Sequence, residues 1–243
     1  MNSILKSCFQ SVNNSKLDSF SKDVHHVVMG LRTSHLIDIT SLDLNQAKDL
    51  LSKLRKNSKQ GQSLILLQFK DRFSFLCNKT LLRQHILSTL SANSLVFIAV
   101  QDREPVKTEM PAQLIYWLQE KLLPFLLTAE PVFYSAVIPK CMVAITGWAL
   151  EYPIIYTTHE ISDGPEDELD EWEVRTNCLG NRCLEVIQCW VADHMLLSFS
   201  YPLCLIDSGE RIARDLELKI NQRLVKEKCQ IKKVQVMLDR LAI

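Results

Sequence analysis

Two continuous apolar runs constrain the fold of this chain more than any other feature. Residues 63–69 read SLILLQF and residues 94–100 read SLVFIAV. Apolar runs of this length without alternation are typical of strands that are covered on both faces of a sheet. Helical periodicity surrounds them, for example in residues 44–57, where leucines recur at spacings of three and four. The order predicts strands that alternate with helices, which favours parallel pairing.

A second pattern lies in the last third of the chain. Residues 182–191 and 195–201 are apolar or alternating, and a turn-like Ala192-Asp193-His194 separates them. This arrangement predicts an antiparallel hairpin near residues 182–201. A chain of 243 residues suits one large domain, or two small ones without a clear boundary between them. We therefore expect an α/β fold, a single globular domain over residues 1–243, with a mixed, mostly parallel sheet flanked by helices and by the hairpin.

The most apolar stretch, and the one most clearly bounded by residues that break secondary structure, is PKCMVAITGWALEYPIIYTTH, residues 139–159. We expect a helix in its first half that breaks at Glu151-Tyr152-Pro153, because proline disfavours helical geometry in the residue before it. Gly147 suits close packing of that helix on the sheet, and the apolar residues after the break suit a central strand. The stretch is therefore interpreted as core, and a functional role would fall to its polar rim, Glu151 and His159.

An acidic block follows directly. Residues 160–173 hold eight acidic side chains and no basic one, and they include Gly164-Pro165. This composition predicts a mobile, solvated acidic loop over residues 160–175. The alternative is a docking loop for another protein with a basic surface, with Trp172 as the apolar anchor.

Charge and hydropathy exclude some partners. The formal net charge is zero, so the chain has no overall electrostatic attraction to nucleic acid, and no nucleic-acid partner is expected. No apolar run approaches the length of a transmembrane helix, so no membrane association is expected. The N-terminal MNSILKSCFQSVNN lacks the pattern of a signal peptide. We therefore expect a cytoplasmic protein with reduced cysteines, with the nucleus as an alternative location.

The motifs that usually identify chemistry are missing. The sequence contains no GxGxxG, GxSxG, HExxH or phosphate-binding P-loop motif and no CxxC pair. Cys178, Cys183 and Cys189 are the nearest approach to a metal cluster, and they are interpreted as packed thiols. We expect no cofactor and no metal site of a familiar type.

One arrangement of polar residues offers a catalytic hypothesis. Ligands of open α/β sheets bind beyond the carboxyl ends of the strands, and Asp38, Asp102 and His159 follow predicted strands. Converging carboxylates and a histidine could bind a divalent cation or perform acid–base chemistry. The alternative is that they only form turns and helix caps. The catalytic candidates are thus Asp38, Asp102 and His159, and the binding candidates are Glu151 and Trp172.

Residues 147–156, GWALEYPIIY, carry a resemblance to a known family. They form a small-residue helix followed by a Leu-x-Tyr-Pro-hydrophobic-hydrophobic-Tyr step. In this the chain resembles an uncharacterised eukaryotic open-reading-frame family, built on one domain of unknown function, whose vertebrate member is named for its place on chromosome 1. Glu151 stands where the resemblance implies a small residue such as glycine. The resemblance implies no activity, cofactor or catalytic residue.

Two functions remain open from the sequence, and whether the chain is an enzyme is not decided. The first is a soluble intracellular protein-interaction or adaptor domain without catalysis, which the missing motifs and the acidic block favour. The alternative is a small-molecule or divalent-metal-dependent enzyme that uses carboxylates at the carboxyl ends of the strands. A pocket lined by Asp38, Asp102 and His159 would favour the enzyme.

Overall fold

The computed structural model describes residues 1–92, 94–158, 177–206, 209–224 and 227–241. The backbone groups into two compact units. Unit 1 comprises Met1–Ser91, Tyr116–Ile138 and Ala149–Glu151, and unit 2 comprises Ala92–Ile115, Pro139–Trp148 and Tyr152–Ile243. The single domain expected over residues 1–243 stays a prediction.

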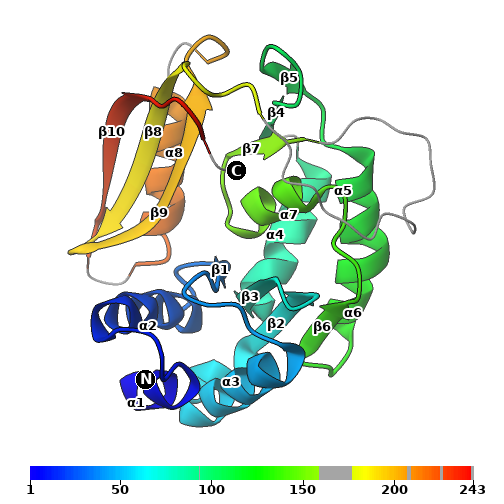
Figure 1. Ribbon diagram of the computed structural model, residues 1–243, viewed down its shortest axis with the longest axis vertical. Helices are drawn as coiled ribbons and strands as arrows, with labels where there is room; N and C mark the ends of the chain where they lie inside the picture. The colour runs from blue at the N-terminus through cyan, green and yellow to red at the C-terminus, as the bar shows by residue number, and fades with distance from the viewer. Residues whose placement is uncertain (93, 159–176, 207–208, 225–226, 242–243) are drawn as a thin grey trace. The chain divides into compact units, whose positions relative to one another are not determined.

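Unit 1 contains a mixed sheet and most of the helices. Its elements are α1 (Asn2–Cys8), α2 (Asn14–Val28), β1 (Ser34–Leu36), α3 (Leu44–Asn57), η1 (Gln60–Ser63), β2 (Leu64–Phe69), β3 (Phe73–Asn78), α4 (Lys79–Ser91), η2 (Trp117–Leu122), α6 (Leu123–Leu127) and β6 (Val132–Ser135). The strand order is β1-β3-β2-β6, which leaves β6 at one edge (Figure 1). β3 pairs antiparallel with both of its neighbours, whereas β6 pairs parallel with β2.

The central strand β2 is buried along its whole length because both of its faces are covered. Leu64 and Leu66 join a core formed with α1, α2 and α3. On the opposite face, the Phe69 ring lies 5.9 Å from the Trp117 ring and 6.0 Å from the Phe133 ring, centroid to centroid. The prediction of a strand covered on both faces, which was based on this apolar run, is confirmed.

Helix α3 begins at a complete capping box. The Asp43 carboxylate accepts hydrogen bonds from the backbone N–H groups of Asn45 and Gln46, both at 2.8 Å, and the Gln46 side chain accepts from the Asp43 N–H at 3.0 Å. These bonds satisfy donors that the first turn leaves free. The helix buries one apolar stripe against the sheet, Ala47, Leu50, Leu51 and Leu54.

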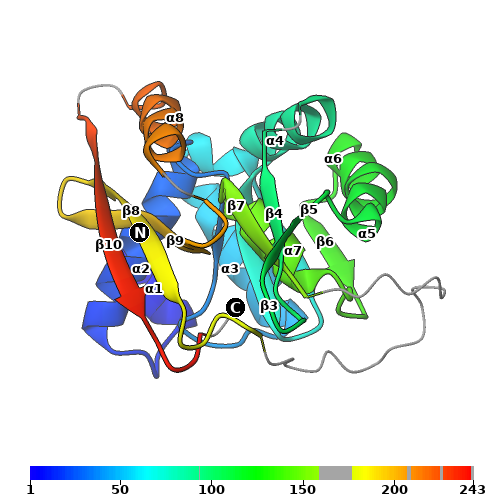
Figure 2. The same ribbon diagram turned by 90° about the horizontal axis from the view of Figure 1, so that it is seen from above.

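Unit 2 contains two three-stranded sheets. The elements that lie wholly or mostly in it are β4 (Val96–Ala99), β5 (Val106–Thr108), α5 (Ala112–Tyr116), α7 (Met142–Ala149), β7 (Ile154–Thr157), β8 (Cys183–Val191), β9 (His194–Pro202), α8 (Glu210–Asn221) and β10 (Cys229–Met237). The strand orders are β5-β4-β7 and β10-β8-β9. Helix α8 runs along the second sheet (Figure 2). Residues of both sheets and α8 share one apolar core, which includes Ile98, Ile154, Ile187, Phe199 and Leu216.

The predicted α/β class, the mixed pairing and the hairpin near residues 182–201 are confirmed, the hairpin as β8 and β9. Among the described residues, however, the strands form three sheets, and only β2–β6 and β4–β7 pair in parallel. The other pairs are antiparallel. Tight turns explain the antiparallel pairs β2–β3 and β8–β9, because strands that a short turn joins must run in opposite directions. The antiparallel pairs β1–β3 and β8–β10 join strands that are distant in the sequence. The apolar pattern does not encode that direction.

The central stretch folds as the sequence indicates. Helix α7 ends at Ala149, and β7 begins one residue after Pro153. A Cβ atom on Gly147 would lie 3.1 Å from Cγ2 of Ile155, so α7 and β7 pack more closely than most side chains allow. None of the helices in the described residues is long and apolar enough to cross a bilayer.

Candidate functional site

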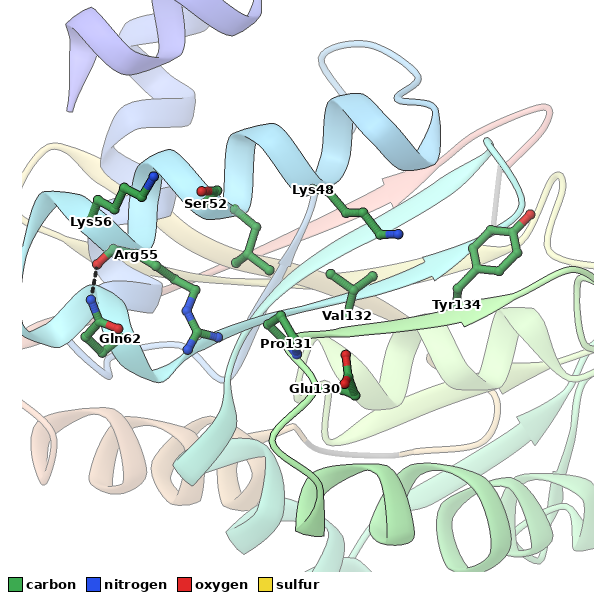
Figure 3. Close-up of a pocket in the computed structure, with 10 residues that line it drawn as sticks. Lys48, Ser52, Arg55, Lys56, Gln62, Glu130, Pro131, Val132 and Tyr134 are labelled. Atoms are coloured by element: carbon green, nitrogen blue, oxygen red, sulfur yellow. Dashed lines mark hydrogen bonds between the residues drawn. The ribbon is translucent and has the colours of Figure 1, made fainter.

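A groove of about 510 Å³ lies in unit 1 between helix α3 and the edge strand β6 (Figure 3). Helix α3 forms one wall, and the other wall is formed by β6 and the two residues before it. Gln62 closes one end. The lining residues are Lys48, Leu51, Ser52, Arg55, Lys56, Gln62, Glu130, Pro131, Val132 and Tyr134.

The groove has a surplus of positive charge. Lys48, Arg55 and Lys56 line it, whereas Glu130 is its one acidic lining residue. The three cations fall on one side of α3 because residues seven or eight positions apart are two helical turns apart. Within the part of the chain that the structure describes, none of the three forms an ion pair. Their charge is therefore available to an anionic ligand.

Arg55 is the fixed cation of the groove. Its Nη1 donates a hydrogen bond to the carbonyl of Leu64 at 3.1 Å, and its own carbonyl accepts from Nε2 of Gln62 at 2.6 Å (Figure 3). Lys48 is exposed and extends from α3 on the side of β6, whereas Lys56 lies at the far end beside Gln62. The site thus combines one hydrogen-bonded guanidinium with two exposed ammonium groups.

The open side of β6 is the second feature of the groove. The carbonyl of Pro131 accepts from the Leu66 N–H, and the carbonyl of Ser135 accepts from the Lys70 N–H, both at 2.9 Å. Since backbone groups alternate in direction along a strand, the N–H and C=O groups of Val132 and Tyr134 point away from β2. β6 is an edge strand, so these groups face no further strand of the described sheet.

The carboxylates predicted at the strand ends lie in different parts of the chain. Asp38 is exposed, two residues after β1 in unit 1, and Asp102 is exposed, three residues after β4 in unit 2. His159 lies outside the described residues, as do Trp172 and the acidic segment 160–175. Among the described residues, no three His, Cys, Asp or Glu side chains come together as a metal-ligand set. The catalytic role of these residues stays a prediction.

Glu151 is buried, with 7% of its surface exposed. Its carboxylate accepts a hydrogen bond from the backbone N–H of Thr33 at 3.0 Å, and the nearby carbonyl of Ala149 accepts from the Ser34 hydroxyl. Its φ angle is 61°, in the left-handed region that glycine adopts most easily. The backbone therefore explains why a glycine was expected at this position. A binding role for Glu151 stays a prediction, and its contacts tie residues 149–151 to the start of β1.

A buried polar network lies next to Thr33 in the sequence. Nη1 of Arg32 lies 3.2 Å from an Asp23 carboxylate oxygen and 3.2 Å from Nδ1 of His35. Arginine can only donate, so Nδ1 of His35 is the acceptor. The network joins α2 to β1 and has little exposure at Asp23 and Arg32, whose side chains are 14% and 9% exposed. It is a closed structural feature, whereas the groove is open.

The chain is thus a mixed α/β protein with a basic groove beside an open sheet edge. It belongs to the family described as a domain of unknown function, DUF4504, whose model matches residues 3–243. The resemblance found in residues 147–156 is confirmed in that respect. Comparison with curated proteins and with solved structures gives no match.

The groove was not predicted from the sequence. The periodicity of residues 44–57 indicates the buried leucines of α3, but it does not indicate what lies opposite the basic residues of the helix. A signal was present, because Lys48, Arg55 and Lys56 recur at a spacing that places them on one side of the helix. The position of Glu130 to Tyr134 opposite that side depends on the pairing of β6 with β2, which is a long-range contact.

Proposed function

We propose that this protein is a non-catalytic interaction module that binds an acidic segment of another protein in the groove between α3 and β6. One observation carries the proposal: three cations without ion-pair partners in the described residues line a groove at an unpaired sheet edge. Arg55 is half-buried, and a half-buried cation attracts a carboxylate more strongly than a fully hydrated one, because water screens it less. The exposed Lys48 and Lys56 add a weaker attraction that salt screens.

The dimensions and the lining of the groove are compatible with this partner. A volume of about 510 Å³ lies within the range of ligand sites in general, and a few residues of a peptide would fill it. Tyr134 is 46% exposed on the groove wall, and tyrosine is enriched in protein interfaces since it offers both apolar area and a hydroxyl group. The lining thus supplies charge for specificity and aromatic surface for affinity.

A defined peptide tests this function. The probe is a fluorescent heptapeptide, Glu-Val-Glu-Val-Glu-Val-Glu, titrated with the full chain at low ionic strength. We expect saturable binding that weakens as salt is added. Lys48→Glu should weaken binding by at least about tenfold, because it replaces attraction by repulsion.

The matched control is Lys6→Glu, which makes the same change of charge at an exposed site on α1, away from the groove. It should leave the affinity nearly unchanged. Equal effects of the two substitutions, or no binding of the peptide by the parent chain, would overturn the proposed function.

The cytoplasm is the compartment that we propose for this interaction. All eight cysteines are free thiols, and three of the exposed or half-buried ones would be vulnerable to oxidation outside a reducing compartment, Cys178, Cys183 and Cys204. Imaging of a tagged chain tests this placement, and accumulation in a secretory compartment would contradict it.

A further inference from the structure

We propose that the partner binds by strand addition: an extended segment with acidic residues at alternate positions pairs with the open edge of β6. This inference rests on the proposed function and deepens it, since it states the conformation and the sequence pattern of the acidic segment. It follows from the direction of the backbone groups on β6 and from the positions of the side chains on its two faces.

The backbone of β6 offers the pairing groups. Val132 and Tyr134 each direct one N–H and one C=O away from β2, because Pro131 and Ser135 direct their carbonyls toward it. An added strand satisfies such groups and gains its affinity from main-chain hydrogen bonds. β6 itself carries no charged residue, whereas the edge strand β10 carries Lys232 and Lys233. Charged residues, lysine above all, are a common protection of strand edges against pairing, and β6 lacks it.

The two faces of β6 specify the pattern of side chains. Val132 and Tyr134 face the groove with Lys48 and Arg55, whereas Phe133 faces the opposite side, where its ring lies 5.5 Å from the ring of Phe125. Side chains alternate between faces in the added strand as they do in β6. Acidic residues would therefore meet the cations of α3, and the residues between them would extend the apolar face at Phe133.

The spacing of charges is compatible with this pattern. Lys48 and Arg55 are two turns apart on α3, which corresponds to roughly 10 Å along the helix. Acidic residues two and four positions apart in a strand are separated by about 7 and 13 Å. Alternation therefore places all four acids of a heptapeptide on the groove face, whereas a block of four adjacent acids places only two there and turns the other two toward the apolar face at Phe133.

Four peptides of equal length test the proposal with the full chain. The first is the alternating Glu/Val heptapeptide, and the second is a block peptide of the same composition, Glu-Glu-Glu-Glu-Val-Val-Val. The third and the fourth are the alternating peptide N-methylated at every second amide, one on the Glu amides and the other on the Val amides. Methylation removes the donors of one strand edge and leaves the charge intact.

We expect the alternating peptide to bind at least about tenfold more tightly than the block peptide. One N-methylated form should lose binding while the other keeps it, since only one edge of the added strand faces β6. Tyr134→Pro should also lose binding, because it removes an N–H that points away from β2 and leaves the ladder with β2 in place. Tyr134→Ala, which keeps that N–H, is its control.

The outcomes separate the two proposals. If the alternating and block peptides bind equally and Lys48→Glu abolishes both, strand addition is overturned while the acidic-segment function stands. Equal behaviour of the two N-methylated forms, or equal affinity of the Tyr134→Pro and Tyr134→Ala variants, likewise overturns strand addition. If neither peptide binds the parent chain, the proposed function fails as well.

Discussion

The guanidinium of Arg55 donates a hydrogen bond to the carbonyl of Leu64 at 3.1 Å, and so joins the C-terminal half of α3 to the first residue of β2. The same side chain lines the groove. One residue therefore stabilises the wall of the site and supplies a positive charge to it. This double role separates Arg55 from Lys48 and Lys56, which are exposed.

Replacement of Arg55 by alanine should reduce stability. A hydrogen bond that involves a charged group contributes about 1.5–3 kcal/mol, so we expect a loss of this size in the free energy of unfolding of Arg55→Ala. Lys56→Ala, the next residue on the same helix, should change it by no more than about 0.5 kcal/mol. Urea denaturation of both variants measures the difference. Equal midpoints would show that the Arg55–Leu64 bond contributes nothing measurable.

The capping box of α3 gives a second prediction. Asp43→Ala removes the acceptor for two backbone donors of the first turn, so the free energy of unfolding should fall by about 1 kcal/mol. Asp43→Asn keeps a side-chain oxygen at the cap and should lose only a fraction of that. Thermal denaturation followed by circular dichroism compares them. An alanine variant as stable as the parent would contradict a stabilising role of the cap.

Two substitutions of Glu151 separate the effect of its carboxylate on stability from the effect of its backbone conformation. Glu151→Ala leaves the buried N–H of Thr33 without its acceptor and keeps a left-handed backbone at 61°. Glu151→Gly loses the same hydrogen bond, but glycine adopts this φ at no steric cost, so the glycine variant should be more stable than the alanine variant by about 1 kcal/mol. Chemical denaturation of the two variants measures the difference in their free energies of unfolding. The reverse order would contradict the assigned backbone conformation.

The Tyr156 hydroxyl should lose its proton at a higher pH than an exposed tyrosine does. Burial raises the pKa of its hydroxyl to about 12, opposed by the hydrogen bond with the Ser200 side chain. The folded-state pKa lies above the unfolded value near 10, so its contribution to stability is complete below about pH 10 and is lost as pH rises toward and through 12. Tyrosinate absorbance of the parent and of Tyr156→Phe shows this group by difference. A difference spectrum that titrates near pH 10 in the folded chain would contradict its burial.

The sequence predicted the elements better than their assembly. The apolar runs at 63–69 and 94–100 correspond to β2 and β4, and helical spacing at 44–57 corresponds to α3, because burial of a strand or a helix face is a local pattern. Residues 112–127 form α5, η2 and α6 in succession, with Pro124 in the first turn of α6. These features are encoded within a few residues of where they occur.

The candidate site depended on contacts that are distant in sequence. Glu130 lines the groove beside Arg55 only because β6 pairs with β2, and no local pattern states which strands pair. Conversely, Asp38 and Asp102 share a local pattern, a carboxylate after a strand, yet they belong to different compact units. Residue chemistry could thus be read from the sequence, whereas the neighbours of each residue could not.

An amide-resolved NMR titration of the full chain with the alternating Glu/Val heptapeptide tests the central claim most directly. The account predicts that the amide resonances of Val132 and Tyr134 shift together with those of α3 around Lys48, and that Lys48→Glu strongly reduces these shifts at the same peptide concentration. Changes in amide resonances that occur only outside β6 and α3 would contradict it. Changes in β6 and α3 that are equally large in Lys48→Glu would also contradict it.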